Sequence, residues 1–291
     1  NYVSGAKLLF EYYQIAKKNS DLISMSRALI NMGESYFYLG NMKKTEQIFN
    51  EALTILKKSQ KKQEVLACMG NLGAIYYMDG DFDLALQYCR RQLTGFIELG
   101  DAAGVARAYG FAGSCNIQMG KYKNALQELN MQLKLSVKLN RAQTISIAYG
   151  NIGTVYNFLG EFEEARKYFN KQIRIDEKLG NSEGLFRATI NIGYQYRYKE
   201  KYTIALKYFS KAINIAHKKK IAPNLSLVNY YYAEALVESE KYQKALNFCS
   251  ELLHNTGKDF TDKYDRLIFV LREKSKILLH KDLEKLRKFS K

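Results

Sequence analysis

A repeat of about 40 residues runs through most of the sequence. When blocks that begin at positions 31, 71, 111, 151, 191 and 231 are laid over one another, the same kinds of residue recur in the same columns. One column holds Gly33, Gly73, Gly113, Gly153, Gly193 and Ala233. A second column holds Thr45, Ala85, Ala125, Ala165, Ala205 and Ala245. A fixed period of this length is typical of arrays in which each repeat is one supersecondary unit.

Each block contains two stretches with the spacing of an amphipathic helix. After Ala85, apolar residues follow at steps of four, at Cys89 and Leu93, and the other blocks repeat these steps. The preceding stretch shows the same kind of stripe at Met25, Ala28 and Met32. The turn between the two helices is marked by Gly40, Gly80, Gly120 and Gly160. Because one such hairpin cannot bury its apolar stripes alone, the sequence predicts stacked hairpins that form a solenoid.

The order of these columns resembles the tetratricopeptide repeat. In that motif a small residue is followed by an aromatic residue three positions later, by Ala nine positions further on and by an apolar residue after another four. The first unit holds Gly33, Tyr36, Thr45 and Phe49 at these places, with Thr45 where the other five units have Ala. The resemblance covers residues 1–257. It implies an all-α, right-handed superhelical solenoid of antiparallel helix hairpins, whose first helices line the inner surface.

Two features differ from the usual repeat. The period is about 40 residues instead of about 34, and the proline that commonly ends the second helix is missing. We therefore expect longer helices and a deeper groove. With Gly100-Asp101 and Gly180-Asn181 between hairpins, the chain is similar to LGN/Pins-type adaptors and to the repeat regions of bacterial signalling proteins and peptide receptors.

The repeat also predicts the organisation of the chain. Residues 1–20 align with second helices and are expected to be half of a truncated hairpin, residues 21–257 form six repeats, and residues 258–291 form a capping helix with a basic extension. Since Asn1 stands in place of Met, we expect the chain to begin inside a longer protein. No apolar run approaches the roughly 18 residues of a membrane-spanning helix, so no membrane span is expected.

An asparagine column on the first helices is the main candidate binding feature. It consists of Asn31, Asn71, Asn151 and Asn191, and is interrupted by Phe111 and Tyr231. Asn is a mediocre helix former, and its amide offers both a donor and an acceptor, as the backbone of a peptide requires. The family resemblance implies that such asparagines hold the backbone of a bound peptide. The alternative is that they cap or bridge neighbouring helices.

Arginines lie one helical turn before this column. Arg27, Arg107 and Arg187 precede the asparagine positions by four residues and are expected to share their face, with Arg197 as a further member. Planar guanidinium groups bind carboxylates through two hydrogen bonds, so an acidic peptide is the predicted ligand. Alternatively, these arginines pair with Glu34, Glu234 or neighbouring helices. Apolar pockets for the ligand are predicted at Tyr194 and Tyr198.

The net charge of +16 is spread along the chain and is expected to speed the encounter with an acidic protein. Lysine clusters at hairpin ends are interpreted as solvated charge. Nucleic acid is not the expected partner, because the sequence has no recognition motif and no basic run with regularly interleaved aromatic residues.

Catalytic and metal sites are not expected. The histidines His217, His254 and His280 lack metal-binding spacing, and the four cysteines are scattered, three of them in core columns. We therefore predict no enzyme activity, no metal and no cofactor. Isolated core thiols without a disulfide framework favour a reducing compartment, the cytoplasm.

Two functions fit these predictions. The first is a protein-interaction module, an adaptor or scaffold that binds an acidic peptide segment of a partner. The second is a regulatory peptide-sensing region that controls an attached signalling output domain. Both use the same groove, and the sequence leaves the oligomeric state open.

Overall fold

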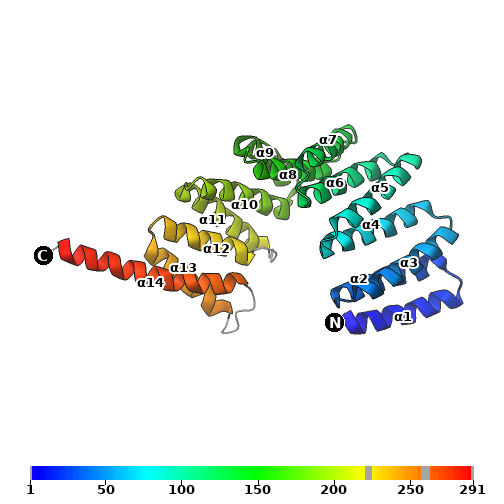
Figure 1. Ribbon diagram of the computed structural model, residues 1–291, viewed down its shortest axis with the longest axis horizontal. Helices are drawn as coiled ribbons and strands as arrows, with labels where there is room; N and C mark the ends of the chain where they lie inside the picture. Colours follow the sequence, from blue (N-terminus) through cyan, green and yellow to red (C-terminus); the bar gives the residue numbers. More distant parts are fainter. Residues whose placement is uncertain (1, 220–224, 257–262, 290–291) are drawn as a thin grey trace. The chain divides into compact units, whose positions relative to one another are not determined.

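The computed structural model describes residues 2–219, 225–256 and 263–289, and within these ranges the chain is helical except for short turns (Figure 1). The all-α, tetratricopeptide-like solenoid that was predicted is confirmed. Hairpin partners pack against one another in the pairs α2 with α3, α4 with α5, α6 with α7, α10 with α11 and α12 with α13. The helices are α1 (Tyr2–Lys18), α2 (Leu22–Tyr38), α3 (Met42–Lys58), α4 (Lys62–Asp79), α5 (Phe82–Glu98), α6 (Ala102–Gln118), α7 (Tyr122–Lys138), α8 (Ala142–Phe158), α9 (Phe162–Leu179), α10 (Ser182–Tyr198), α11 (Tyr202–Lys219), α12 (Leu225–Glu238), α13 (Tyr242–Thr256) and α14 (Lys263–Phe289).

The turns between helices recur at an even interval, half of the repeat, and share one backbone conformation. A residue with positive φ occurs at Ser20, Gly40, Gln60, Gly80, Gly100, Gly120, Asn140, Gly160, Gly180, Glu200 and Glu240. This left-handed conformation ends a helix and lets the following amides reach its last carbonyl groups. After α4, for example, the amide of Asp81 donates a hydrogen bond of 2.9 Å to the carbonyl oxygen of Tyr76. In the described residues, the turns within hairpins and the turns between them therefore use the same backbone conformation.

Several helices begin at a side chain that caps free backbone amides. Asp21 accepts hydrogen bonds from the amides of Ile23 and Ser24, both at 3.1 Å. The same role belongs to Asn41, Asp81, Asp101 and Asn181. A cap of this kind stabilises a helix by about 1 kcal/mol.

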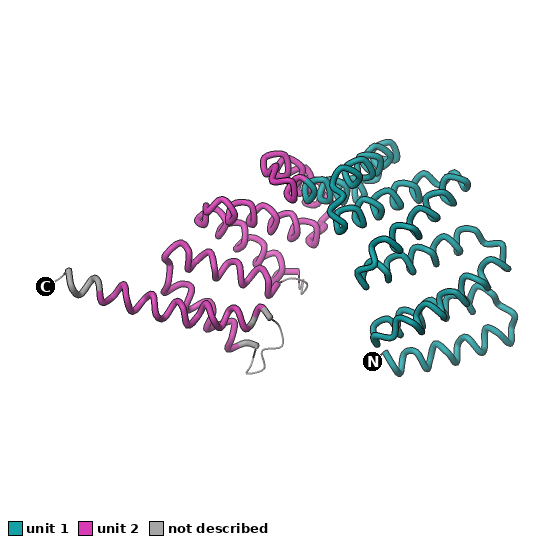
Figure 2. Tube along the Cα trace, in the orientation of Figure 1, with its two compact units in different colours: residues 1–155 teal, residues 156–291 magenta. Residues whose placement is uncertain are grey.

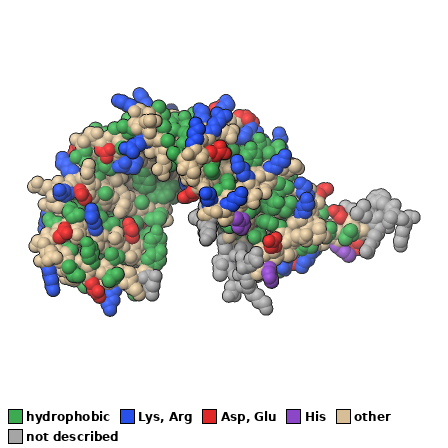
Figure 3. Space-filling view, turned by 180° about the vertical axis from the view of Figure 1, so that it is seen from behind, with side chains coloured by type: hydrophobic (Ala, Val, Ile, Leu, Met, Phe, Trp, Pro, Cys, Tyr) green, Lys and Arg blue, Asp and Glu red, His purple; other side chains and the backbone are tan. Residues whose placement is uncertain are grey.

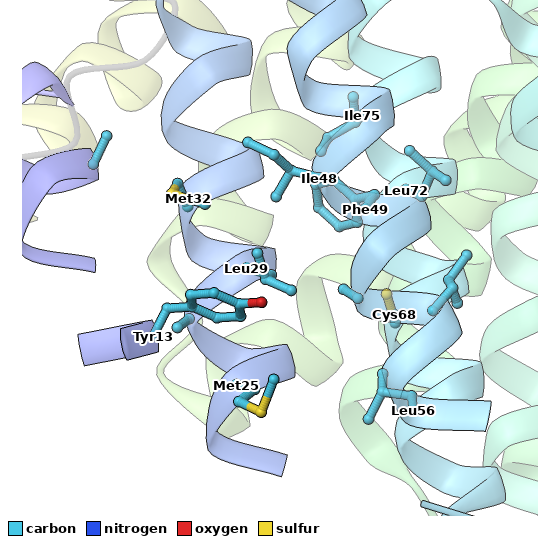
Figure 4. Close-up of a cluster of buried hydrophobic side chains, with 14 of the residues drawn as sticks. Tyr13, Met25, Leu29, Met32, Ile48, Phe49, Leu56, Cys68, Leu72 and Ile75 are labelled. Carbon is cyan, nitrogen blue, oxygen red and sulfur yellow. The ribbon is translucent and has the colours of Figure 1, made fainter. Parts of the chain in front are cut away.

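Glycines in the first helices allow aromatic rings of the second helices to pack against the backbone. A Cβ atom at Gly33 would lie 2.6 Å from the ring of Phe49, and one at Gly193 would lie 2.7 Å from the ring of Phe209. Both rings are fully buried. Figure 4 shows Phe49 in the core of the first hairpins, close to Ile48 and Leu72. The small column of the repeat is thus a packing requirement.

The chain consists of two compact units, residues 1–155 and residues 156–291 (Figure 2). Their boundary falls inside α8 instead of in a linker. In unit 1, α1 to α6 pack in sequence and α6 packs on α7; in unit 2, α9 to α13 pack in sequence and α14 packs on α12 and α13. Each unit has hydrophobic clusters of its own.

Parts of the predicted C-terminal region lie outside the described residues. These parts are residues 257–262 and 290–291. In the described part of the chain, no helix is long and apolar enough to cross a membrane.

Candidate peptide-binding surface

The predicted binding residues of unit 1 lie on the solvent side of the first helices. In α2, Arg27 and Asn31 are exposed, whereas Ala28 and Met32, one residue further on in each case, are buried in the core. Asn71 on α4 and Arg107 on α6 are exposed as well. Asn151 on α8 is half-buried. In each unit, we call the surface defined by the predicted Asn and Arg columns the Asn/Arg face.

Two of these residues from different hairpins line one open pocket. Asn71 from α4 and Arg107 from α6 border a cavity of about 570 Å³, together with Phe111 from α6 and Phe96 from α5. Gln63 and Gln92 contribute further amide groups to its wall. We call this cavity the α4–α6 pocket. It combines donors, acceptors, a positive charge and two aromatic rings within one unit.

Arg107 is held at the rim of this pocket but remains open to solvent. Its guanidinium group lies 3.8 Å from the carboxylate of Asp101 and 5.6 Å from the centre of the Phe96 ring. The side chain is 63% exposed. Asp101 is at the same time the cap of α6, because its other oxygen accepts a hydrogen bond from the amide of Gly104. A ligand carboxylate can therefore reach Arg107 in competition with one neighbouring carboxylate.

The four predicted asparagines have free side-chain amides. In the part of the chain that the structure describes, none of the four donates or accepts a side-chain hydrogen bond within the protein. The alternative role, bridging or capping of neighbouring helices, requires such a bond. The amides are thus available to a ligand.

In unit 2, the exposed members of the predicted set are Arg187 and Tyr198, both on α10, and Asn191 between them is half-buried. The side chain of Tyr198 is 75% exposed, and its ring centre lies 5.3 Å from that of Phe162. The ring of Tyr198 is therefore exposed to solvent and packs against the ring of Phe162.

Arg197 and Tyr194 are engaged inside unit 2. Arg197 donates a hydrogen bond of 2.5 Å to the carboxylate of Glu234, and its guanidinium group lies 4.8 Å from the centre of the Tyr231 ring. Tyr230 donates a further hydrogen bond to Glu234. Arg197 thus adopts the ion-pair alternative that the sequence left open, and a ligand carboxylate would have to displace Glu234 to reach it.

The ring of Tyr194 packs between Phe209 and Tyr231, with ring centres 6.0 Å and 4.4 Å away. Burial raises the pKa of its hydroxyl group, so the group stays protonated. Tyr194 is half-buried, and its ring is consequently engaged in contacts within unit 2.

Sequence reasoning missed the walls of the α4–α6 pocket. Phe111 was recognisable as an interruption of the Asn column, and it lies in this pocket beside Asn71. Gln92 and Phe96 belong to the second helix α5, on which no binding residue was predicted. The residue periodicity of one helix does not predict which side chains of the neighbouring helix line the same pocket.

Metal and thiol chemistry find no support at this surface. Among the described residues, no group of three His, Cys, Asp or Glu side chains could hold a metal ion. The four cysteines are free and buried. Burial raises the pKa of Cys68, Cys89 and Cys115 to about 12, so these thiols are protonated and poorly nucleophilic at neutral pH.

These features define an α-helical repeat protein with an exposed polar surface on its first helices. The profile of the tetratricopeptide repeat matches residues 24–91, 65–136 and 144–218. The chain belongs to the tetratricopeptide repeat family, whose stacked hairpins form extended binding surfaces. No curated protein sequence matches the chain significantly.

Several solved structures share the fold. A signal transduction ATPase with numerous domains and a tetratricopeptide repeat sensor, from Pyrococcus horikoshii, superimposes with a TM-score of 0.68 at 14% identity, over 93% of this chain and 43% of that one. Aspartyl phosphate phosphatase F from Bacillus subtilis gives a TM-score of 0.67 at 15% identity, over 91% and 73% of the two chains. The quorum sensor NprR from B. thuringiensis gives 0.61 at 17% identity, over 93% and 81%. The chain thus spans less than half of the ATPase, and at these identities the similarity concerns the fold alone.

Proposed function

We propose that the chain is a protein-interaction module that binds a peptide segment of a partner, of acidic character, on the Asn/Arg face. The observation that carries the proposal is the α4–α6 pocket, where Asn71 and Arg107 from different hairpins meet beside aromatic walls. The chain then acts by binding and not by catalysis. Its free, buried cysteines support a cytoplasmic location.

The chemistry of the pocket fits a peptide. The side-chain amide of Asn71 can donate to a peptide carbonyl and accept from a peptide N–H at once. Arg107 supplies a fork of donors for a ligand carboxylate, while Phe96 and Phe111 offer apolar surface to a neighbouring ligand side chain. The pocket could thereby bind the backbone, a carboxylate and an apolar side chain of one short peptide segment at the same time.

The charge of the molecule supports an acidic ligand. The net charge is +16, and Lys and Arg side chains are spread over the visible face in Figure 3, among fewer Asp and Glu side chains. A field of this sign raises the rate of encounter with an acidic segment. Asp101 at the pocket rim limits how many ligand carboxylates fit there. We therefore infer one carboxylate of the ligand at Arg107.

A second candidate is a regulatory peptide-sensing region that controls an attached output domain. It is favoured by the structural similarity to a tetratricopeptide repeat sensor and to a quorum sensor. This role would use the same face, but it requires an output domain in the same polypeptide, which an adaptor does not need. Similarity to LGN/Pins-type adaptors remains an expectation.

The test is a quantitative pull-down with the chain as bait, followed by mass spectrometry. Two variants change the Asn/Arg face: Asn151→Ala with Asn191→Ala, and Arg107→Glu with Arg187→Glu. A matched control, Lys134→Glu with Arg174→Glu, makes the same change in net charge at exposed positions on α7 and α9.

Recovery of the partner is expected to fall at least about tenfold for both face variants, which corresponds to about 1.4 kcal/mol, and to change little for the control. Circular dichroism and thermal melting should be nearly the same for all proteins. Wild-type recovery by both face variants would contradict the proposal.

A further inference from the structure

A larger cavity lies in unit 2, apart from the Asn/Arg face. Its volume is about 690 Å³, and its walls come from α11, α12 and the start of α13. It shares no residue with the predicted Asn and Arg columns. We call it the α11–α13 groove.

Five lysines line this groove. Lys207, Lys211 and Lys218 lie on α11, Lys241 lies in the turn before α13, and Lys244 lies in the first turn of α13. The three lysines of α11 are four and seven residues apart, which places them on one face of the helix over about 16 Å. Positive charge therefore follows both sides of the groove.

These charges are not neutralised within the protein. In the described ranges, none of the five lysines forms an ion pair, and none of the residues that line the groove is Asp or Glu. The sequence of α11 itself contains no acidic residue. Like charges that lie close together repel one another, and an anionic partner would reduce this repulsion.

The floor of the groove is apolar. It is formed by Leu206 and Ile215 from α11 and by Tyr232 and Leu236 from α12. Leu206 and Leu236 are nearly covered, whereas Ile215 and Tyr232 are half-buried and contribute open apolar surface. The groove thus combines an apolar base with charged rims.

A separate acidic notch adjoins the groove at the turns. Glu200, Glu238 and Glu240 border it, and Thr203 belongs to both cavities. Among the residues that line these two cavities, acidic side chains therefore occur only in the notch, beside Lys201, whereas the groove along α11 is lined by lysines.

We propose that the α11–α13 groove binds an amphipathic helix of a partner protein whose apolar stripe is flanked by Asp and Glu. The apolar stripe would cover Ile215 and Tyr232, and the flanking carboxylates would face the lysines on both sides. Helices dock in apolar grooves through residues three and four positions apart, and the span of the α11 lysines corresponds to about three helical turns.

A nucleic acid fits this groove less well. Single strands are bound on series of exposed aromatic rings that stack on successive bases, and the floor here is mainly aliphatic. A phosphate backbone would also leave the apolar floor uncovered. The structure thus offers two interaction surfaces, and the second does not depend on the proposed function of the first.

The probe is a fluorescein-labelled synthetic peptide of about 18 residues, with a Leu stripe flanked by Glu, long enough to match α11. A scrambled peptide of the same composition, which cannot form an amphipathic helix, is the peptide control. Mixed-sequence single-stranded RNA of similar length tests the other class of polyanion. Affinities are measured by fluorescence anisotropy at about 150 mM salt, where long-range attraction is screened.

Lys207→Glu with Lys211→Glu is expected to weaken binding of the amphipathic peptide at least about tenfold, because attraction becomes repulsion at one rim. The matched control, Lys123→Glu with Lys134→Glu on α7 of unit 1, should change the affinity less than about threefold, since it alters only the net charge. All four lysines are exposed, and circular dichroism verifies the fold of each variant. Arg107→Glu with Arg187→Glu should leave this binding intact.

Four outcomes would overturn the inference. Equal binding of the scrambled peptide would mean general charge attraction. An equal loss of peptide affinity for the groove variant and for the α7 control variant would also mean general charge attraction. Tighter binding of RNA that disappears with Lys207→Glu and Lys211→Glu would identify a nucleic-acid surface. Loss of peptide binding with the Arg107 and Arg187 variant alone would move the peptide to the Asn/Arg face.

Discussion

The guanidinium group of Arg107 lies 3.8 Å from the carboxylate of Asp101, which also caps the helix that carries Arg107. One carboxylate thus begins α6 and orients an exposed cation at the rim of the α4–α6 pocket. The two roles can be separated by mutation, because Asn caps a helix about as well as Asp but carries no charge.

Asp101→Asn is expected to raise the affinity for an acidic partner by a few fold, since an exposed ion pair is worth about 0.2–1 kcal/mol and would no longer compete. Its free energy of unfolding should remain nearly unchanged. Asp101→Ala should also release Arg107 but lower stability by about 1 kcal/mol through loss of the cap. Isothermal titration and urea unfolding check both effects, and weaker binding by Asp101→Asn would argue against competition.

Two helical glycines should respond in opposite ways to alanine. At Gly5 in α1 a Cβ atom would meet nothing within 4 Å, so Gly5→Ala should stabilise the protein by about 1 kcal/mol through helix propensity. At Gly193 the new Cβ would press on the buried ring of Phe209, and overpacking costs about 1–3 kcal/mol. Gly193→Ala should therefore lower the free energy of unfolding in urea.

A double-mutant cycle identifies the cause of that loss. Phe209→Leu should cost less in the Gly193→Ala background than in the wild type, because the smaller side chain leaves room for the methyl group. Additive effects would show that the contact between Gly193 and Phe209 is not responsible.

Glu240 is in the left-handed conformation, with φ of 58°. This conformation costs a residue with a side chain about 1–2 kcal/mol, and glycine escapes the cost but loses more chain entropy on folding. We expect Glu240→Gly to stabilise the protein by about 0.5 kcal/mol, and Gly80→Ala, at φ of 92°, to destabilise it by about 1 kcal/mol. Urea unfolding measures both, with Glu177→Gly inside α9 as a destabilising control. A loss of stability with Glu240→Gly would contradict this account of the turns.

The buried thiols make the protein sensitive to alkaline pH. Burial raises the pKa of Cys68, Cys89 and Cys115 to about 12, above the ordinary value near 9, so the unfolded chain loses these protons first as the pH rises. Their contribution to stability is complete below about pH 9 and is lost between about pH 9 and pH 12. At pH 8 the thiols of the native protein should not react with Ellman's reagent, whereas in denaturant all four should react. Rapid reaction in the native state would contradict their burial.

Much of the fold could be predicted from the sequence because the same pattern of small and apolar residues recurs in six repeats. The glycine and alanine columns reflect close helix contacts, so they recur wherever hairpins stack. Several turns were less visible: Gln60 and Glu200 adopt the left-handed conformation without the glycine that usually reveals it. The packing of the two adjoining helices imposes that conformation, and the residue types at these turns do not predict it.

The surroundings of the candidate binding residues were predictable only in part. Helical spacing placed Asn31 and Arg27 on one exposed side, since that depends on one helix alone. The ion pair between Arg197 and Glu234 depends on how α10 packs against α12, because the two residues are 37 positions apart in the sequence. The wall that Phe96 adds to the α4–α6 pocket depends in the same way on a neighbouring helix.

The even spacing of the left-handed positions sets the step by which such a chain can grow. Duplication of a full repeat would add a whole hairpin, and every downstream side chain would keep its role in its helix. Duplication of half a repeat, a single helix with its turn, would exchange first-helix and second-helix positions beyond the insertion, which would turn Asn191 and Arg187 away from the side they now occupy. Duplication of whole hairpins would therefore preserve the Asn/Arg face, and each added hairpin would supply one further set of its positions.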